Sequence, residues 1–236
     1  MSNQYFDFKQ FRIDQDKCSM KVGTDGVLLG AWFPMEGENN VLDVGCGTGL
    51  VAIMAAQRGA GSVTAVEIDP EASQQAFRNA ANSPWTDRIA VKCADIADFS
   101  GGKYDRIVCN PPYFRDSLRC PDSGRNTARH NDFLSYETLV ACAVRMLTDD
   151  GLLCVVLPYD SVETFAKCAV ASGFEMCRRT DVVTVAGKAP KRSLVAFSRH
   201  CPYLEKNILE ICGTDGEETP EYVALVRDFY LKYQMP

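Results

Sequence analysis

The 236-residue sequence contains no run of about 18 apolar residues, the length that a membrane-spanning helix needs. Its first residues mix acidic, basic and aromatic side chains, and so lack the basic and then apolar order of a secretory signal. None of the 11 cysteines forms a C-x-x-C pair, and their number is odd, which argues against a disulfide framework. We therefore expect a cytoplasmic protein with reduced cysteines that is neither exported nor bound to a membrane.

Histidine is also scarce, because only His130 and His200 occur. Two imidazoles so far apart in the chain are a poor basis for a zinc or iron site, and we expect no metal. The formal net charge of −6 argues against attraction of the whole surface to nucleic acid. A composition of 46% hydrophobic and 24% charged residues is typical of a globular domain, and we expect one monomeric domain over residues 1–236.

Short β-branched runs alternate with longer helical patterns, which predicts a Rossmann-like α/β fold with helices on both faces of a mostly parallel, seven-stranded sheet. Parallel strands are expected at 41–44, 63–68, 89–93, 104–109 and 152–157. Helices are expected at 50–57, 70–80, 136–147 and 162–171. The strand at 152–157 is apolar on both faces and should be central. Two extended runs, 176–185 and 193–198, predict an antiparallel hairpin at the sheet edge.

We expect three parts within this domain. Residues 1–39 form an N-terminal extension in which Phe6, Phe8 and Phe11 lie in short extended segments. Residues 40–200 form the Rossmann-like core. Residues 201–236 form a helical C-terminal tail, because apolar residues recur on one side of a helix over 220–230.

A glycine-rich turn joins the first core strand to the first core helix. It begins with Asp43, and Gly45, Gly47 and Gly49 allow the backbone to approach a ligand closely. The spacing G-x-G-x-G departs from the dinucleotide pattern G-x-G-x-x-G, so no pyrophosphate is implied. Glu67 ends the next strand, where a carboxylate can accept hydrogen bonds from both hydroxyls of a ribose.

A third acidic residue, Asp95, follows the third strand and is placed to accept a hydrogen bond from an adenine amino group. The same residue would also serve as a helix cap or a turn residue. Asp43, Glu67 and Asp95 together put acidic groups along one rim of the sheet. That rim suits S-adenosylmethionine, whose sulfonium and ammonium groups are both cationic.

The most specific motif is Asn110-Pro111-Pro112-Tyr113, at the carboxyl end of the fourth strand. An exocyclic amine of adenine, or a glutamine amide, is a poor nucleophile because its lone pair is delocalised. If the Asn110 side-chain oxygen and the Pro111 carbonyl accept its N–H bonds, the lone pair is directed at the methyl donor. Both acceptors also stabilise the positive charge that grows on nitrogen, and Tyr113 can stack on the flat group.

These residues resemble those of the class I S-adenosylmethionine-dependent amino-methyltransferases. Three further segments are similar to the bacterial enzymes that methylate N6 of the adenine immediately 3′ of the anticodon in a valine tRNA: FDFKQF at 6–11, MKVGTDGVLLGAW at 20–32 and GKAPKR at 187–192. The resemblance runs nearly from end to end. It implies that the turn containing Thr24 and Asp25 faces the methionine end of the cofactor, whereas the local sequence alone also allows Asp25 to act as a helix cap.

Basic residues are frequent between positions 178 and 206, where the sequence has seven basic residues and only two acidic ones. Such a run also suits a solvated hairpin face. With a tRNA as substrate, we expect Lys188, Lys191 and Arg192 to contact RNA. Arg115 and Arg129, in the polar stretch after Tyr113, are expected to contact phosphates as well.

The Asn-Pro-Pro-Tyr motif alone does not separate DNA adenine, RNA adenine and protein glutamine as acceptors. We expect tRNA and not DNA, because the chain leaves little room for the elements that read a major groove. A base in an anticodon loop is already partly unstacked, so flipping it costs little. A release-factor glutamine methyltransferase and a non-catalytic module that binds cofactor or RNA stay as alternatives.

Overall fold

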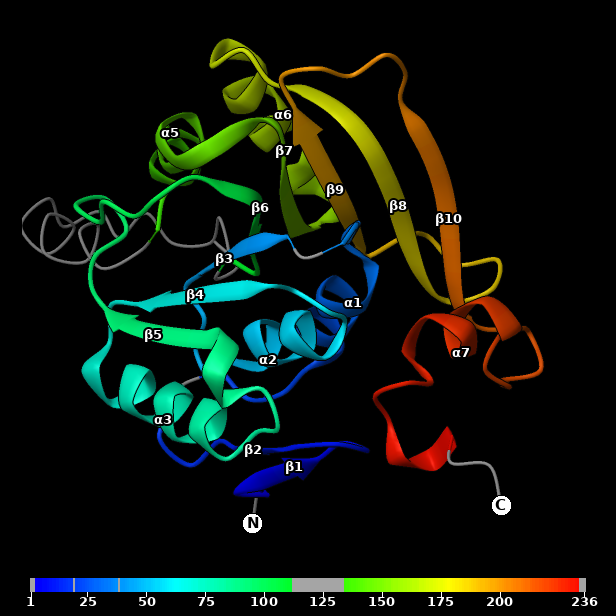
Figure 1. Ribbon diagram of the computed structural model, residues 1–236. Helices are drawn as coiled ribbons and strands as arrows, with labels where there is room; N and C mark the ends of the chain where they lie inside the picture. Colours follow the sequence, from blue (N-terminus) through cyan, green and yellow to red (C-terminus); the bar gives the residue numbers. More distant parts are fainter. Residues whose placement is uncertain (1–2, 19, 38, 112–133, 234–236) are drawn as a thin grey trace, which may run out of the picture.

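The computed structural model describes residues 3–18, 20–37, 39–111 and 134–233, and strands and helices alternate along most of the core (Figure 1). The strands are β1 (Tyr5–Asp7), β2 (Arg12–Asp14), β3 (Asn40–Val44), β4 (Ser62–Glu67), β5 (Ile89–Cys93), β6 (Tyr104–Cys109), β7 (Leu147–Pro158), β8 (Glu175–Val185), β9 (Arg192–Ser198) and β10 (Glu205–Cys212). The helices are α1 (Thr24–Trp32), α2 (Leu50–Gln57), α3 (Pro70–Ala81), α5 (Tyr136–Met146), α6 (Val162–Ala171) and α7 (Pro220–Val226).

One sheet contains eight of these strands in the order β10-β8-β9-β7-β6-β3-β4-β5 (Figure 1). Strand β9 is antiparallel to β7 and β8, whereas the other neighbouring pairs are parallel. The order reverses at β3, because the chain continues from it to β4 and β5 on one side and later returns to β6 on the other. Sheets of this kind bind ligands outside the carboxyl ends of the strands at such a switch point, so the ends of β3 and β6 mark the candidate site.

The prediction of seven strands is wrong by one. The antiparallel hairpin of β8 and β9 is confirmed, but β10 pairs in parallel with β8 beyond it. The first four residues of β10 are exposed, and Ile208 is 70% exposed, so this edge strand lacks the alternation of a strand with one covered face. The C-terminal part, predicted to be a helical tail, therefore begins with a strand and becomes helical only at α7.

Helices cover both faces of the sheet, as predicted. One hydrophobic cluster packs α1 and α2 against the sheet, and a second packs α5 and α6 against the opposite face. Alternate residues of β7 divide between these clusters: Cys154 and Val156 belong to the first, and Leu153, Val155 and Leu157 to the second. All five side chains are fully buried, which confirms the predicted central strand.

The predicted helix ends are confirmed at two positions. Asp69 is the N-cap of α3 and accepts a hydrogen bond from the backbone N–H of Ala72 at 2.8 Å, with Pro70 in the first turn. Helix α6 stops before Gly173, whose φ of +83° favours glycine because it lacks a Cβ. These local signals determine where α3 begins and where α6 ends.

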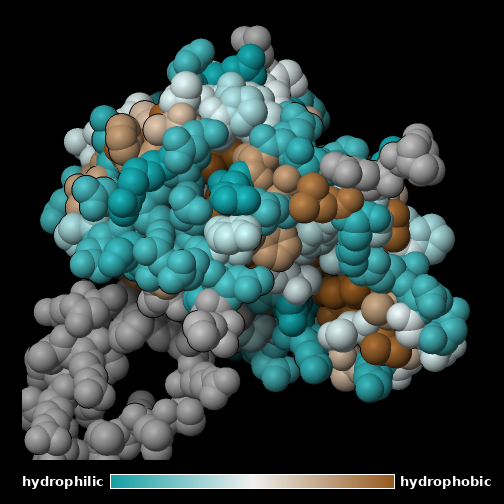
Figure 2. Space-filling view, turned by 90° about the horizontal axis from the view of Figure 1, so that it is seen from below, coloured by the Kyte–Doolittle hydropathy of each residue, from teal (hydrophilic) through white to brown (hydrophobic). Residues whose placement is uncertain are grey.

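The N-terminal aromatic segment forms the predicted short extended pieces, because β1 and β2 pair in antiparallel fashion. Phe8 and Phe11 are buried beside them with stacked rings 4.6 Å apart. Figure 2 views the molecule from this side, where hydrophilic residues cover most of the surface and the apolar ones form separate patches.

Three features of the described residues concern the expectations about membranes, cysteines and metals. No helix among them has the length and apolar character to cross a membrane. Their ten cysteines are free. In the same ranges, no group of three or more His, Cys, Asp and Glu side chains is arranged to hold a metal ion.

Candidate active site

The turn after β3 owes its shape to three glycines with positive φ angles. These angles are +67° at Gly45, +53° at Gly47 and +80° at Gly49, in the left-handed region that side chains other than glycine rarely adopt. The backbone N–H of Gly45 donates to the Val66 carbonyl at 2.9 Å, which fixes the turn to β4. A Cβ on Gly49 would meet the Cβ of Ala76 at 3.3 Å, so this glycine also permits close packing of α3.

Asp43 lies under this turn and is 2% exposed. Its Oδ2 accepts a hydrogen bond from the backbone N–H of Ala52 at 3.0 Å, in the first turn of α2. Burial raises the pKa of the Asp43 carboxyl to about 7, and the charge of Glu67 acts in the same direction. Asp43 therefore holds the start of α2 in place, and its buried carboxyl takes up a proton at a higher pH than an exposed aspartate does.

Glu67 closes the turn from the end of β4. Its Oε2 accepts a hydrogen bond from the Gly47 N–H at 2.9 Å, and its Oε1 accepts one from the Asp69 N–H at 3.0 Å. Each carboxylate oxygen has a second lone pair that can accept from a ligand hydroxyl. Glu67 is thus held in a fixed orientation beside the glycine turn, where a ribose was predicted.

Asp95 lies apart from these acidic residues. It is exposed, its Oδ1 accepts a hydrogen bond from the Ala97 N–H at 2.8 Å, and it is not among the described residues that line the cavity of Asp43 and Glu67. The structure thus shows the turn geometry that the sequence also allowed. A contact between Asp95 and an adenine amino group stays a prediction.

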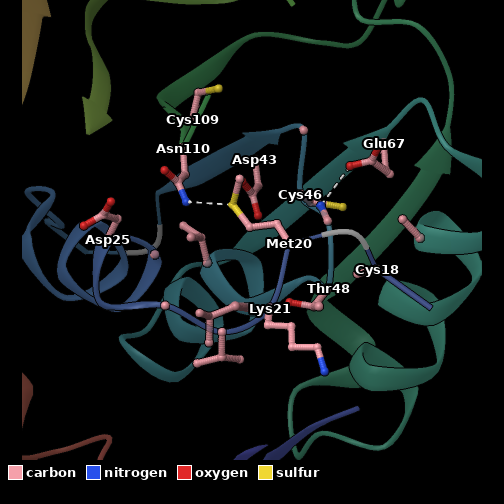
Figure 3. A pocket seen from close by; sticks show the side chains of 18 of the residues that line it. Cys18, Met20, Lys21, Asp25, Asp43, Cys46, Thr48, Glu67, Cys109 and Asn110 are labelled. Carbon is pink, nitrogen blue, oxygen red and sulfur yellow. Dashed lines mark hydrogen bonds between the residues drawn. The ribbon is translucent and has the colours of Figure 1, made fainter. Parts of the chain in front are cut away.

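A cavity of about 720 Å³ opens at the carboxyl ends of β3 and β6, a volume in the usual range for small-molecule sites. The described part of its wall comprises Lys17, Cys18, residues 20–26, residues 43–48, Leu50, Val51, residues 67–69, Glu71, Ala72, Cys109, Asn110, Leu134 and Arg192. Figure 3 shows Glu67 and Asp25 toward opposite sides of this cavity, with Asp43 and Asn110 between them.

Asn110 follows β6 and brings the side-chain amide of the motif to this cavity. Its Oδ1 is buried and has no hydrogen-bond partner among the described residues. Its Nδ2 donates to the sulfur of Met20 at 3.8 Å, a contact drawn in Figure 3. A buried carbonyl without a partner costs about 1–3 kcal/mol, so this oxygen is an acceptor that favours binding of an N–H donor.

The remaining residues of the motif divide between described and undescribed parts of the chain. Pro111 is buried directly after Asn110. Pro112 and Tyr113 lie outside the described residues, as do Arg115 and Arg129. Stacking by Tyr113 and the RNA contacts of the two arginines therefore stay predictions.

The interpretation of Asp25 as a helix cap is wrong. Helix α1 begins at Thr24, its N-cap is Gly23, and no side chain caps it. Asp25 lies in the first turn, and its Oδ1 accepts a hydrogen bond from Nη1 of Arg192. Thr24 and Asp25 both line the cavity, and their contact with the methionine end of the cofactor stays a prediction.

The three cations predicted to contact RNA, Lys188, Lys191 and Arg192, lie in two different environments. Lys188 and Lys191 are exposed, as an RNA contact requires. Arg192 instead lines the cavity and pairs with Asp25, and its side chain is only 23% exposed. The sequence grouped these three cations, but the structure separates Arg192 from the two lysines.

Two polar residues of α3, which sequence reasoning missed, hold the segment before α1 over the cavity. Asn79 accepts a hydrogen bond from the Asp14 N–H at 3.0 Å and donates to the carbonyls of Asp14 and Thr48, each at 2.9 Å. Gln75 accepts one from the Lys17 N–H at 3.2 Å. Both side chains are buried and lie four residues apart on the inward face of an amphipathic helix, and this spacing was the available signal.

Comparisons with known proteins agree with this geometry. The family model described as methyltransferase small domain matches residues 18–174. A Bacteroides fragilis (strain YCH46) protein named tRNA1(Val) (adenine(37)-N6)-methyltransferase is 49% identical over 239 residues, which cover 98% of this chain and 100% of that protein. A protein of the same name from Yersinia enterocolitica serotype O:8 / biotype 1B is 44% identical, over 97% of this chain and 93% of that protein.

Solved structures show the same fold at lower identity. A predicted O-methyltransferase of Agrobacterium tumefaciens matches with a TM-score of 0.67 and 20% identity, over 87% of this chain and 96% of that one. A ribosomal protein L11 methylase of Lactobacillus delbrueckii subsp. bulgaricus matches with a TM-score of 0.57 and 22% identity, over 79% and 83%. From the family model and the near full-length relatives together, the chain belongs to the methyltransferase small domain family and, within it, to the tRNA1(Val) (adenine(37)-N6)-methyltransferases.

Proposed function

We propose that this chain transfers the methyl group of S-adenosylmethionine to N6 of adenine 37 in tRNA1(Val). The observation that carries the proposal is the buried Oδ1 of Asn110, which lies in the same cavity as the glycine turn and Glu67 and has no hydrogen-bond partner within the described ranges. Near full-length relatives that are named for this reaction support the choice of acceptor. Because the proposed substrate is a tRNA, we also propose that the chain acts in the cytoplasm.

The residues of the cavity fit S-adenosylmethionine. Glu67 offers lone pairs for the two ribose hydroxyls, and the open space at Gly45 and Gly47 lets a ligand lie against the backbone. Asp25 and Glu67 supply negative charge toward a ligand that carries a sulfonium and an ammonium. When bound, this cofactor supplies an electrophilic methyl group.

The protein's part in the reaction is to orient and stabilise the acceptor nitrogen. The Asn110 Oδ1 accepts one N–H of the amine and the Pro111 carbonyl accepts the other, so the lone pair of the nitrogen is directed toward the methyl donor. As positive charge grows on the nitrogen, both acceptors interact with it more strongly, which lowers the barrier, and the methylated nitrogen then loses one of its protons to water. Asn110 and Pro111 are thus the proposed catalytic residues among those described.

We also propose that the exposed Lys188 and Lys191 contact the tRNA backbone, and that Arg115 and Arg129 add phosphate contacts. We expect one domain, with residues 1–39 as an extension and 201–236 as a tail, acting as a monomer on tRNA and not on DNA. The same two acceptor oxygens would suit a glutamine amide, so protein glutamine methylation is an outcome that the experiment must separate.

The experiment incubates the chain and labelled S-adenosylmethionine with three transcripts of tRNA1(Val): unmodified, with guanine at position 37, and with guanine at position 38. Total protein and total DNA are parallel acceptors. We expect label in the first and third transcripts only, recovered as N6-methyladenosine after digestion. Label in the guanine-37 transcript, in DNA or in glutamine of a protein would overturn the proposed acceptor.

A further inference from the structure

Arg192 is placed in the cavity by the β8–β9 hairpin. It is the first residue of β9 and pairs in register with Pro158 of β7 and Val182 of β8, so the sheet fixes its backbone on both sides. Its Nη1 donates to the Asp25 Oδ1, and the two side chains are 23% and 16% exposed. The strand pairing and the ion pair with Asp25 therefore fix the Arg192 guanidinium in the cavity wall.

Acidic side chains outnumber basic ones in the described part of the cavity wall. Its acidic members are Asp25, Asp43, Glu67, Asp69 and Glu71, and its basic members are Lys17, Lys21 and Arg192. The two lysines are exposed, and Figure 3 shows Lys21 directed away from Asn110 and Asp25. Arg192 is therefore the one half-buried cation among the described residues of the wall.

The amino-acid end of the methyl donor carries an α-ammonium and also an α-carboxylate, so the cavity wall must provide a partner for each of these opposite charges. Asp25 can hold the ammonium, but a carboxylate beside it would meet mainly negative charge. Glu67 is suited to the ribose, and Asp25 lies on the opposite side of the cavity (Figure 3), so the amino-acid end belongs near Asp25 and Arg192. The fork of a guanidinium matches a carboxylate with two parallel hydrogen bonds.

We propose that Arg192 binds the α-carboxylate of the methyl donor while Asp25 binds its α-ammonium. The donor then takes the place of the direct Asp25–Arg192 contact, and each protein charge keeps an opposite partner. This inference rests on the proposed function and deepens it. It makes Arg192 a specificity residue for donors with an intact amino-acid end, and removes it from the predicted RNA contacts.

The test measures ligand affinity by calorimetry in the absence of RNA. The two probes are S-adenosylhomocysteine and the same molecule without its α-carboxylate, and the variants are Arg192→Gln, Arg192→Lys and the neighbouring Lys191→Gln. We expect the unaltered chain to prefer the carboxylate-bearing probe roughly 10- to 100-fold. We expect Arg192→Gln to reduce this ratio to about one by weakening only that probe, Arg192→Lys to retain part of it, and Lys191→Gln to preserve it.

A purely structural role for Arg192 predicts a different result, in which Arg192→Gln weakens both probes equally and the ratio is preserved. That outcome, or an unchanged affinity for both probes, would overturn the proposal while the proposed function stands. If Arg192→Gln fails to fold, the ratio in Arg192→Lys decides, and an unreduced ratio there overturns the proposal. If the unaltered chain binds neither probe, both the inference and the proposed function fail.

Discussion

Replacing Asn110 by alanine separates its proposed catalytic role from any structural one. The variant loses the acceptor oxygen but leaves the glycine turn and Glu67 in place, so we expect the rate of methyl transfer to fall about 10²- to 10³-fold, or about 2.7–4 kcal/mol in the barrier. The affinity for S-adenosylhomocysteine should stay nearly unchanged. The assay is single-turnover transfer to tRNA with saturating donor, beside calorimetry of donor binding.

The same substitution has an unusual expected effect on stability. Because the Asn110 Oδ1 is buried and has no partner in the part of the chain that the structure describes, its presence in the free chain costs about 1–3 kcal/mol. Removing it should leave the free energy of unfolding in urea unchanged or raise it, in contrast to most substitutions of half-buried residues. The control is Asn110→Asp, which keeps acceptor oxygens and should lose less activity. Unchanged turnover in the alanine variant would refute the catalytic role of Asn110. A clear loss of stability in that variant would refute the inference that the buried Asn110 Oδ1 destabilises the free chain.

Three further predictions concern the turn, the buried acid and the hairpin. Gly49→Ala should lower the free energy of unfolding by about 1–2 kcal/mol, because alanine is strained at a φ of +80°; equal urea midpoints would contradict this. The raised pKa of Asp43 means that the folded state holds a proton which the unfolded state releases, so stability should decline by up to about 4 kcal/mol as pH rises from 4 to 7. Asp43→Asn should flatten that part of the profile, and an unaltered profile would show that Asp43 does not titrate there. Replacing Lys188 and Lys191 together by glutamine should weaken tRNA binding and reduce its salt slope by about 2; an unchanged slope would mark a solvated face.

The fold was predictable wherever local chemistry and the sheet period agreed. Asp69 and Pro70 announce a helix start that the structure confirms, and the five apolar residues 153–157 belong to a strand that is buried on both faces. Strand β10 escaped prediction because half of it faces solvent at the sheet edge. Its pairing with β8 depends on a long-range register that its own sequence does not encode.

The sequence predicted which residue types form the site, but not which side chains contact one another there. Asn110, Glu67 and Asp43 follow strands whose ends meet at the switch point, so topology alone brings them to one cavity. Lys191 and Arg192 are neighbours in the sequence, yet one is exposed and the other pairs with Asp25 from a distant helix. Charge counted along the chain does not reveal this division, because the register of β9 decides which side chain enters the cavity.

The most direct test of the account is a crystal structure of the chain with S-adenosylhomocysteine and an anticodon stem-loop of tRNA1(Val). We predict the N6 atom of adenine 37 at about 2.7–3.2 Å from the Asn110 Oδ1, with the ribose hydroxyls of the cofactor product on Glu67. A cofactor product bound away from the glycine turn, or an Asn110 oxygen that faces no substrate nitrogen, would contradict it.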